Sequence, residues 1–75
     1  MSGTDGKSGV TARQLACVQA HLTTGSMKAA AHELGISPLT VRNHLETVRL
    51  RLGVDTTEQA VAILVSRGRL KVPTR

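Results

Sequence analysis

The sequence predicts an all-α fold, one small domain of four short helices. Four segments each begin at a serine or threonine that can cap a helix, and each ends at a glycine. Between these signals the apolar residues recur at helical spacing, and no run alternates as a strand would. A chain of 75 residues is long enough for one such domain and no more.

The composition narrows the class of partner. Ten Lys and Arg residues oppose five Asp and Glu residues, and the resulting formal charge of +5 favours a polyanion. There is no Phe, Tyr or Trp, so single strands and RNA loops cannot be bound by stacking on aromatic rings. Double-stranded DNA therefore becomes the favoured candidate among nucleic-acid partners. The core must be aliphatic, and we expect stability at the low end of about 5–15 kcal/mol.

The first helix is predicted from a capping box formed by Thr11 and Gln14. It should run to about Thr24 and end at Gly25. Spacing assigns its core face to Leu15, Val18 and Leu22, and leaves Cys17 open.

Cys17 is the only cysteine of the chain. It excludes an internal disulfide and fits a reducing compartment, and a lone cysteine is most often a small packed hydrophobe. No apolar run could span a membrane, and the N-terminus lacks the apolar core of a signal peptide. We therefore expect a cytoplasmic protein.

The next two segments predict a helix-turn-helix. Ser26 can cap a helix through Leu34, and Gly35 with Ile36 makes a tight turn into Ser37. The inner face expected for this helix consists of Met27, Ala30, Ala31 and Leu34. In such a motif the second helix enters the major groove of DNA and the first crosses the backbone.

The helix predicted over residues 37–52 has both ends marked. Ser37 suits the N-cap, Pro38 the first helical position, and Gly53 the left-handed residue that follows a helix. Its buried stripe is predicted to be Val41, Leu45, Val48 and Leu52. The opposite face carries Leu39, Arg42, Asn43, Glu46, Arg49 and Leu50. That face is either a solvated surface or one that touches DNA.

A fourth helix is expected from about Thr57 to Arg67, with a capping box at Thr56 and Gln59 and a stop at Gly68. Residues 60–65 are all apolar, so one face should pack on the core while the other is available to a second copy. Residues 1–9 are rich in Gly, Ser and Thr and predict a flexible leader, in which a phosphate contact by Lys7 is the alternative. The domain should span residues 10–70, followed by a basic tail over residues 71–75.

Five short motifs, each occurring once, lie at characteristic distances from one another along this chain. Residues 10–14 read Val-Thr-Ala-Arg-Gln, residues 26–31 read Ser-Met-Lys-Ala-Ala-Ala, and residues 36–45 read Ile-Ser-Pro-Leu-Thr-Val-Arg-Asn-His-Leu. Leu-Gly-Val follows at 52–54 and Ala-Val at 60–61. Together they resemble the LuxR/GerE-type (also NarL/FixJ-type) DNA-binding domain, from Val10 to about Leu70.

This sequence departs from that family's pattern at a few positions. Gln14 and Ala29 stand where relatives usually carry Glu, Ala30 where they carry Ile, and Glu46 where they often carry a basic residue. Residues 25–31 also resemble the LysR-type helix-turn-helix. That family continues into a wing and a long linker helix instead of a short fourth helix, which favours the LuxR type.

The resemblance implies that the helix over 37–52 is the recognition helix. The base-edge contacts that it implies are Arg42, Asn43 and Glu46. The implied phosphate contacts are Lys28, Thr40 and His44, with Arg49 or Arg51 helping. Ser37 and Leu39 complete the predicted DNA-binding set. It also implies a weak two-fold dimer contact through the fourth helix, for which Val61 and Val65 are the candidates.

The chemistry of the three base-facing residues suits different bases. The planar fork of Arg42 matches O6 and N7 of guanine, which gives about 1–3 kcal/mol of discrimination. Asn43 could pair with adenine, Glu46 could accept a hydrogen bond from N4 of cytosine, and Leu39 could pack on a thymine methyl.

The predicted function is therefore a sequence-specific regulator of transcription that binds double-stranded DNA as a dimer. The alternatives are a protein-interaction adaptor or anti-repressor on the same scaffold, or a helical subdomain of a larger chain; a regulatory protein partner is compatible with each. No enzyme, cofactor or metal is predicted, because His21, His32 and His44 share no metal-ligand spacing and no catalytic set is recognisable.

Overall fold

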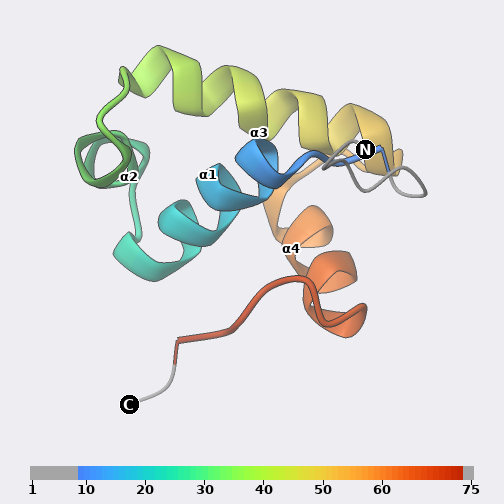
Figure 1. The fold of residues 1–75 in the computed structure, drawn as a ribbon. Helices are drawn as coiled ribbons and strands as arrows, with labels where there is room; N and C mark the ends of the chain where they lie inside the picture. Colours follow the sequence, from blue (N-terminus) through green and yellow to red (C-terminus); the bar gives the residue numbers. More distant parts are fainter. Residues whose placement is uncertain (1–8, 74–75) are drawn as a thin grey trace.

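The computed structural model describes residues 9–73, and every regular element in that range is a helix (Figure 1). In chain order the helices are α1 (Ala12–Thr24), α2 (Met27–Leu34), α3 (Pro38–Leu52) and α4 (Thr57–Ser66). The predicted all-α domain of four helices is confirmed. None of the described helices is long and apolar enough to cross a bilayer.

All four helices begin at the hydroxyl caps predicted from the sequence. The capping side-chain oxygens of Thr11, Ser26, Ser37 and Thr56 accept hydrogen bonds of 3.0–3.1 Å from the backbone N–H three residues later. The reciprocal half of the capping box is also present in α1 and α4, where Gln14 and Gln59 accept from the N-cap N–H at 3.0 and 3.1 Å. These bonds pair backbone donors that a helix start otherwise leaves unsatisfied.

The turn between α2 and α3 depends on Gly35. Its φ of 71° lies in the left-handed region, which a side chain disfavours. This conformation brings the Ile36 N–H to the Ala31 carbonyl at 3.0 Å, closing the end of α2. Only Ile36 and Ser37 then separate Gly35 from α3. The helix-turn-helix is therefore short and tightly bonded.

The last helix ends one residue earlier than predicted. Arg67 is the C-cap of α4, and Gly68 follows it with a φ of 73°. The N–H groups of Gly68 and Arg69 bond back to the carbonyls of Val65 and Leu64, at 2.9 and 2.8 Å. Gly68, the residue after the C-cap, thus ends the helix.

The core lies where the helices meet. α1 packs on α2 and α3, α2 packs on α3, and α4 packs on α3. The buried apolar residues are Val10, Cys17, Val18, Ala20, Ala30, Ala31, Val41, Leu45, Val48, Ala60, Leu64 and Leu70. Most of the predicted core is among them, and Leu15, Leu34 and Leu52 pack against it while partly buried. The position left open at Cys17 is a core position.

Two predicted core residues lie elsewhere. Met27 is 38% exposed, because it is the first residue of α2 and helical side chains lean toward the N-terminus, here beyond the end of the helix. Leu22 is only half-buried and lines a groove beside α4. The small residues Ala30 and Ala31 form the close contact surface of α2 instead.

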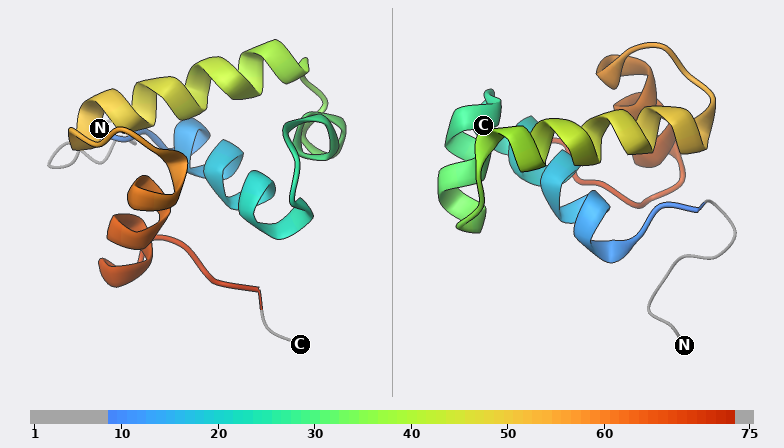
Figure 2. Two further views of the ribbon diagram at one scale, coloured as in Figure 1. Left: turned by 180° about the vertical axis from the view of Figure 1, so that it is seen from behind. Right: turned by 90° about the horizontal axis from the view of Figure 1, so that it is seen from above.

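The segment after α4 returns to α1 (Figures 1 and 2). The side-chain amide of Gln19 donates to the Lys71 carbonyl and accepts from the Lys71 N–H, both at 2.9 Å. Leu70 is buried just before this pair. The start of the predicted basic tail is thus held by its backbone, while Arg75, Lys7 and the rest of the predicted leader except Gly9 lie outside the described residues.

Candidate nucleic-acid interface

The outer face of α3 is left uncovered by the other helices. α3 extends along one side of the molecule, with α1 and α4 on its other side (Figures 1 and 2). Val41, Leu45 and Val48 anchor it to the core. The outward stripe contains Leu39 and Leu50, which are 62% and 80% exposed, and the polar residues between them.

Most of the residues predicted to contact DNA lie on this face or on its two edges. Arg42 and Asn43 are exposed, and Glu46 beside them is half-exposed. On one edge Thr40 and His44 are half-buried, and Arg51 packs its side chain against Gly9. On the other edge Arg49 turns toward α4. The predicted set is therefore one contiguous stripe with two flanks.

The first turn of α3 uses its hydroxyls locally. The Ser37 hydroxyl accepts from the Thr40 N–H at 3.1 Å and shares a 2.9 Å hydrogen bond with the Thr40 hydroxyl. Both side chains therefore stabilise the start of the helix that bears the exposed stripe. Lys28, the predicted phosphate contact from α2, is exposed.

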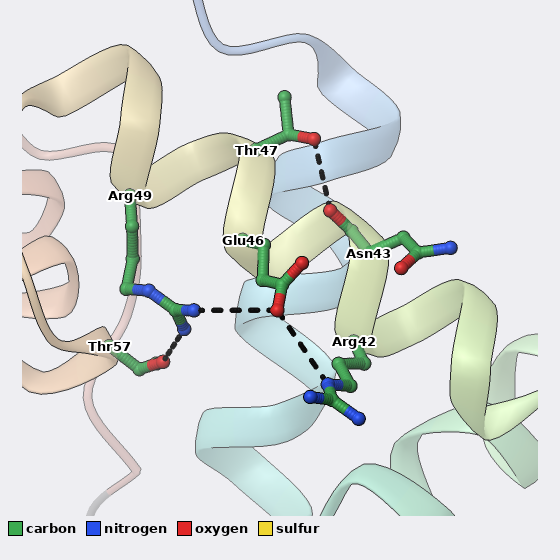
Figure 3. A network of polar contacts seen from close by, with 6 residues as sticks. All are labelled: Arg42, Asn43, Glu46, Thr47, Arg49 and Thr57. Carbon is green, nitrogen blue, oxygen red and sulfur yellow. Dashed lines mark hydrogen bonds and ion pairs between the residues drawn. The ribbon is translucent and has the colours of Figure 1, made fainter.

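A polar network that the sequence analysis did not predict crosses the centre of the stripe (Figure 3). Glu46 Oε2 lies 3.6 Å from Arg42 Nε and 3.9 Å from Arg49 Nη2. Arg49 Nη1 donates a 3.1 Å hydrogen bond to the Thr57 hydroxyl at the first position of α4. One carboxylate is thus shared by two arginines, and the second arginine ties α3 to α4.

The i,i+4 and i,i+3 spacings of Arg42, Glu46 and Arg49 are the sequence signal for these pairs, because residues so spaced are neighbours on a helix. The Arg49–Thr57 bond has no such signal, since it depends on how α4 packs. Asn43 is different again. Its carbonyl accepts from the Thr47 hydroxyl at 3.0 Å, while Figure 3 shows its side-chain amide pointing away from the network.

A second surface lies between the end of α1 and α4. A mainly apolar groove of about 640 Å³ runs between the end of α1, α4 and the returning C-terminal segment. The residues lining it are His21, Leu22, Gly25, Thr57, Glu58, Val61, Ala62, Val65, Ser66 and Val72. Val61 and Val65, the candidate dimer residues, are both half-buried there.

The titratable groups form no metal centre among the described residues, where no three His, Cys, Asp or Glu side chains come together in a way that could hold an ion. Cys17 is buried as part of the core. Burial raises the pKa of its thiol, and the nearby Arg13 guanidinium opposes that shift only in part. The thiol therefore stays protonated and acts as an apolar core group.

Comparison with protein families decides the class of this domain. A family model described as bacterial regulatory proteins, luxR family (GerE), matches residues 8–64, from before α1 to within α4. The chain belongs to the luxR family. No curated protein matches it significantly.

Membership of this family makes the chain a helix-turn-helix DNA-binding domain of the kind found in transcription regulators. It also settles the choice between the two helix-turn-helix families that the sequence resembles. In this luxR-family domain, α2 and α3 are the two helices of the motif. The ion pairs of Glu46 with Arg42 and Arg49 lie on the second of them, α3.

Proposed function

We propose that α3 is a recognition helix that enters the major groove of double-stranded DNA, and that the domain regulates transcription by reading a specific site. The observation that carries the proposal is the outward stripe of α3, where the guanidinium of Arg42 and the amide of Asn43 project from an anchored helix. Such groups can form bidentate pairs with guanine and adenine in the major groove. Glu46, between them, can accept from cytosine N4.

The flanks of the stripe supply the non-specific part of the affinity. Phosphate contacts position a protein on the duplex without reading its sequence. The exposed ammonium of Lys28 and the first turn of α3, with Ser37 and Thr40, suit that role. His44 and Arg51 on the far edge extend it. Leu39, exposed near the start of α3, suits contact with a thymine methyl.

The domain binds its site as a weak dimer formed through α4. Val61 and Val65 leave part of their apolar surface in the groove beside α4, where Leu22 and Val72 add to it. Apolar surface of this kind gains free energy when a second copy removes it from water. Two recognition helices related by a two-fold axis would then require two half-sites.

Selection from a random duplex pool tests the proposal, with the wild type and Arg42→Ala compared at moderate salt. We expect the wild type to enrich a motif with two-fold symmetry. In Arg42→Ala, preference at one base position per half-site should fall by about 1–3 kcal/mol. Arg67→Ala, which removes an exposed arginine just after α4, is the matched control and should keep the motif.

A uniform loss of affinity in Arg42→Ala, with the motif intact, would make Arg42 a phosphate contact. Lys28→Ala should show that behaviour, weakening every sequence alike and lowering the slope of affinity against salt by about one.

A protein-interaction adaptor or anti-repressor on this scaffold is the second candidate. The observation that favours it is the same apolar groove beside α4, which a partner's helix could fill. Salt-sensitive binding to duplex DNA distinguishes the two, because counterion release accompanies phosphate contacts and not the burial of an apolar groove. A wild type that enriches no duplex would direct the search to partners of this groove.

A further inference from the structure

The geometry points to Glu46 as a positioning residue, one that orients Arg42 so that Arg42 reads guanine. This inference rests on the proposed function of α3, and it replaces the direct contact of Glu46 with cytosine by a role that acts through Arg42. It concerns Glu46, the acidic residue of the outward stripe, whose negative charge opposes contact with DNA. Its carboxylate forms ion pairs with both arginines of the network in Figure 3.

The contact with Arg42 uses the inner edge of the guanidinium. Glu46 Oε2 lies 3.6 Å from Arg42 Nε, and the two terminal nitrogens of Arg42 point away from the carboxylate (Figure 3). Neither terminal nitrogen has a partner among the described residues. The pair of donors that matches O6 and N7 of guanine is thus left facing outward.

The second arginine holds the carboxylate in place. Arg49 Nη2 lies 3.9 Å from the same oxygen, and Arg49 Nη1 donates to the Thr57 hydroxyl at 3.1 Å. The side chain of Arg49 is only 28% exposed, against 46% for Glu46 and 63% for Arg42. Arg49, the least exposed of the three charged side chains and tied to α4, therefore restrains Glu46, which in turn restrains the more exposed Arg42.

The physical consequence appears on binding. In free solution an exposed ion pair is weak, so Glu46 biases the orientation of Arg42 and does not lock it. When DNA covers the stripe, water is excluded and the pair strengthens. The same carboxylate repels phosphates. Glu46 thus lowers affinity for unrelated DNA while it raises the penalty for a base other than guanine opposite Arg42.

A double-mutant cycle in the duplex selection tests this role, using the wild type, Glu46→Gln, Arg42→Ala and the double variant. An arginine–guanine pair discriminates by about 5- to 150-fold. We expect the guanine preference of Glu46→Gln to be severalfold lower than that of the wild type, and its affinity for unrelated DNA to be higher. In the Arg42→Ala background, Glu46→Gln should change no base preference. Glu33→Gln, which neutralises an exposed carboxylate on α2, is the matched control and should leave the motif unchanged.

Two results would overturn the inference. An unchanged guanine preference in Glu46→Gln would show that Arg42 needs no positioning. A new loss of preference in the Arg42→Ala background, at a neighbouring base, would show that Glu46 reads a base itself. A wild type that enriches no motif is a separate outcome, seen before any Glu46 variant is compared, and it would refute the proposed function and this inference with it. Equal thermal midpoints for all four proteins exclude a folding effect.

Discussion

Cys17 shows how burial decides the chemistry of a single residue. The sequence leaves its placement on α1 open, and the structure places its thiol fully inside the core. Helical spacing alone could not choose, because Val18 shares one face of the helix with Leu15 and Leu22 and an overlapping face with Cys17. The packing of α2 and α3 on α1 accompanies the burial of the face that carries Cys17.

We predict that the Cys17 thiol of the folded protein reacts slowly with thiol-specific reagents. Its burial blocks access and raises the pKa of the thiol, so the reactive thiolate is scarce. Labelling at mildly alkaline pH, followed by mass spectrometry, should proceed only as fast as the domain opens. Fast stoichiometric labelling of the folded domain would contradict the buried placement.

The same pKa shift predicts how stability depends on alkaline pH. The folded state holds the thiol proton more tightly than the unfolded state, so Cys17 contributes fully below the unfolded pKa. That contribution is lost as pH rises through the folded pKa. Urea midpoints measured across this range should fall for the wild type. Cys17→Ala, although less stable throughout, should lack the part of the fall due to the thiol.

At the scale of elements, the ends of the helices were the most predictable feature of the fold. Caps are local chemistry: a hydroxyl such as that of Ser37 pairs an N–H within one turn, whatever packs around it. Which face of a helix is buried, by contrast, depends on the packing of other elements and not on local chemistry. Met27 has helical spacing for the core, yet it stands at the exposed start of α2. The Arg49–Thr57 bond likewise depends on the placement of α4, which no pattern within α3 encodes.

Gly35 allows a test of the turn that joins α2 to α3. Gly35→Ala should destabilise the domain by about 1–2 kcal/mol, because a side chain disfavours the φ of 71°. A Cβ at this position would meet no heavy atom within 4 Å, so the cost is conformational and not steric. Urea unfolding measures the change. Gly35→Asn, which tolerates the left-handed region, should lose less.

The outcome that would contradict this account is an equal loss in both variants, which would indicate that the side chain itself clashes. A second readout is DNA binding. The conformation at Gly35 sets the direction in which α3 leaves α2, so the alanine variant should weaken binding beyond its effect on folding.

At the scale of the whole molecule, stability depends on a small aliphatic core. A domain of this size buries a modest share of its chain's surface, and no aromatic side chain adds to it. Leu64, on α4, is among the largest fully buried side chains, whereas Leu50, on α3, is 80% exposed. The same substitution at these two leucines therefore separates the core from the surface.

We predict that Leu64→Ala costs about 2–5 kcal/mol, which is most of the stability expected for such a domain. Leu50→Ala should change stability by less than about 0.5 kcal/mol. Thermal unfolding followed by circular dichroism measures both. Similar losses in the two variants would mean that Leu50 is covered in solution, for example by a second copy of the domain.

Dimerisation is the property of the whole molecule that the sequence could only suggest. The apolar run of residues 60–65 predicts one face packed on the core and one available to a second copy, and within one copy only Ala60 and Leu64 are fully covered. Val61 and Val65 remain half-buried in the groove beside α4. We predict that Val61→Glu prevents self-association, because a second copy would have to desolvate the carboxylate.

Sedimentation should show the wild type, and not Val61→Glu, forming dimers at high concentration. On DNA, the variant should bind a duplex with two half-sites more weakly than the wild type does, while both bind a single half-site equally. Ala12→Glu adds the same charge at the opposite end of α1 from Leu22 and should behave as the wild type. If Val61→Glu kept the preference for two half-sites, the dimer contact would lie outside this groove, and the apolar surface of α4 would be left for a different protein.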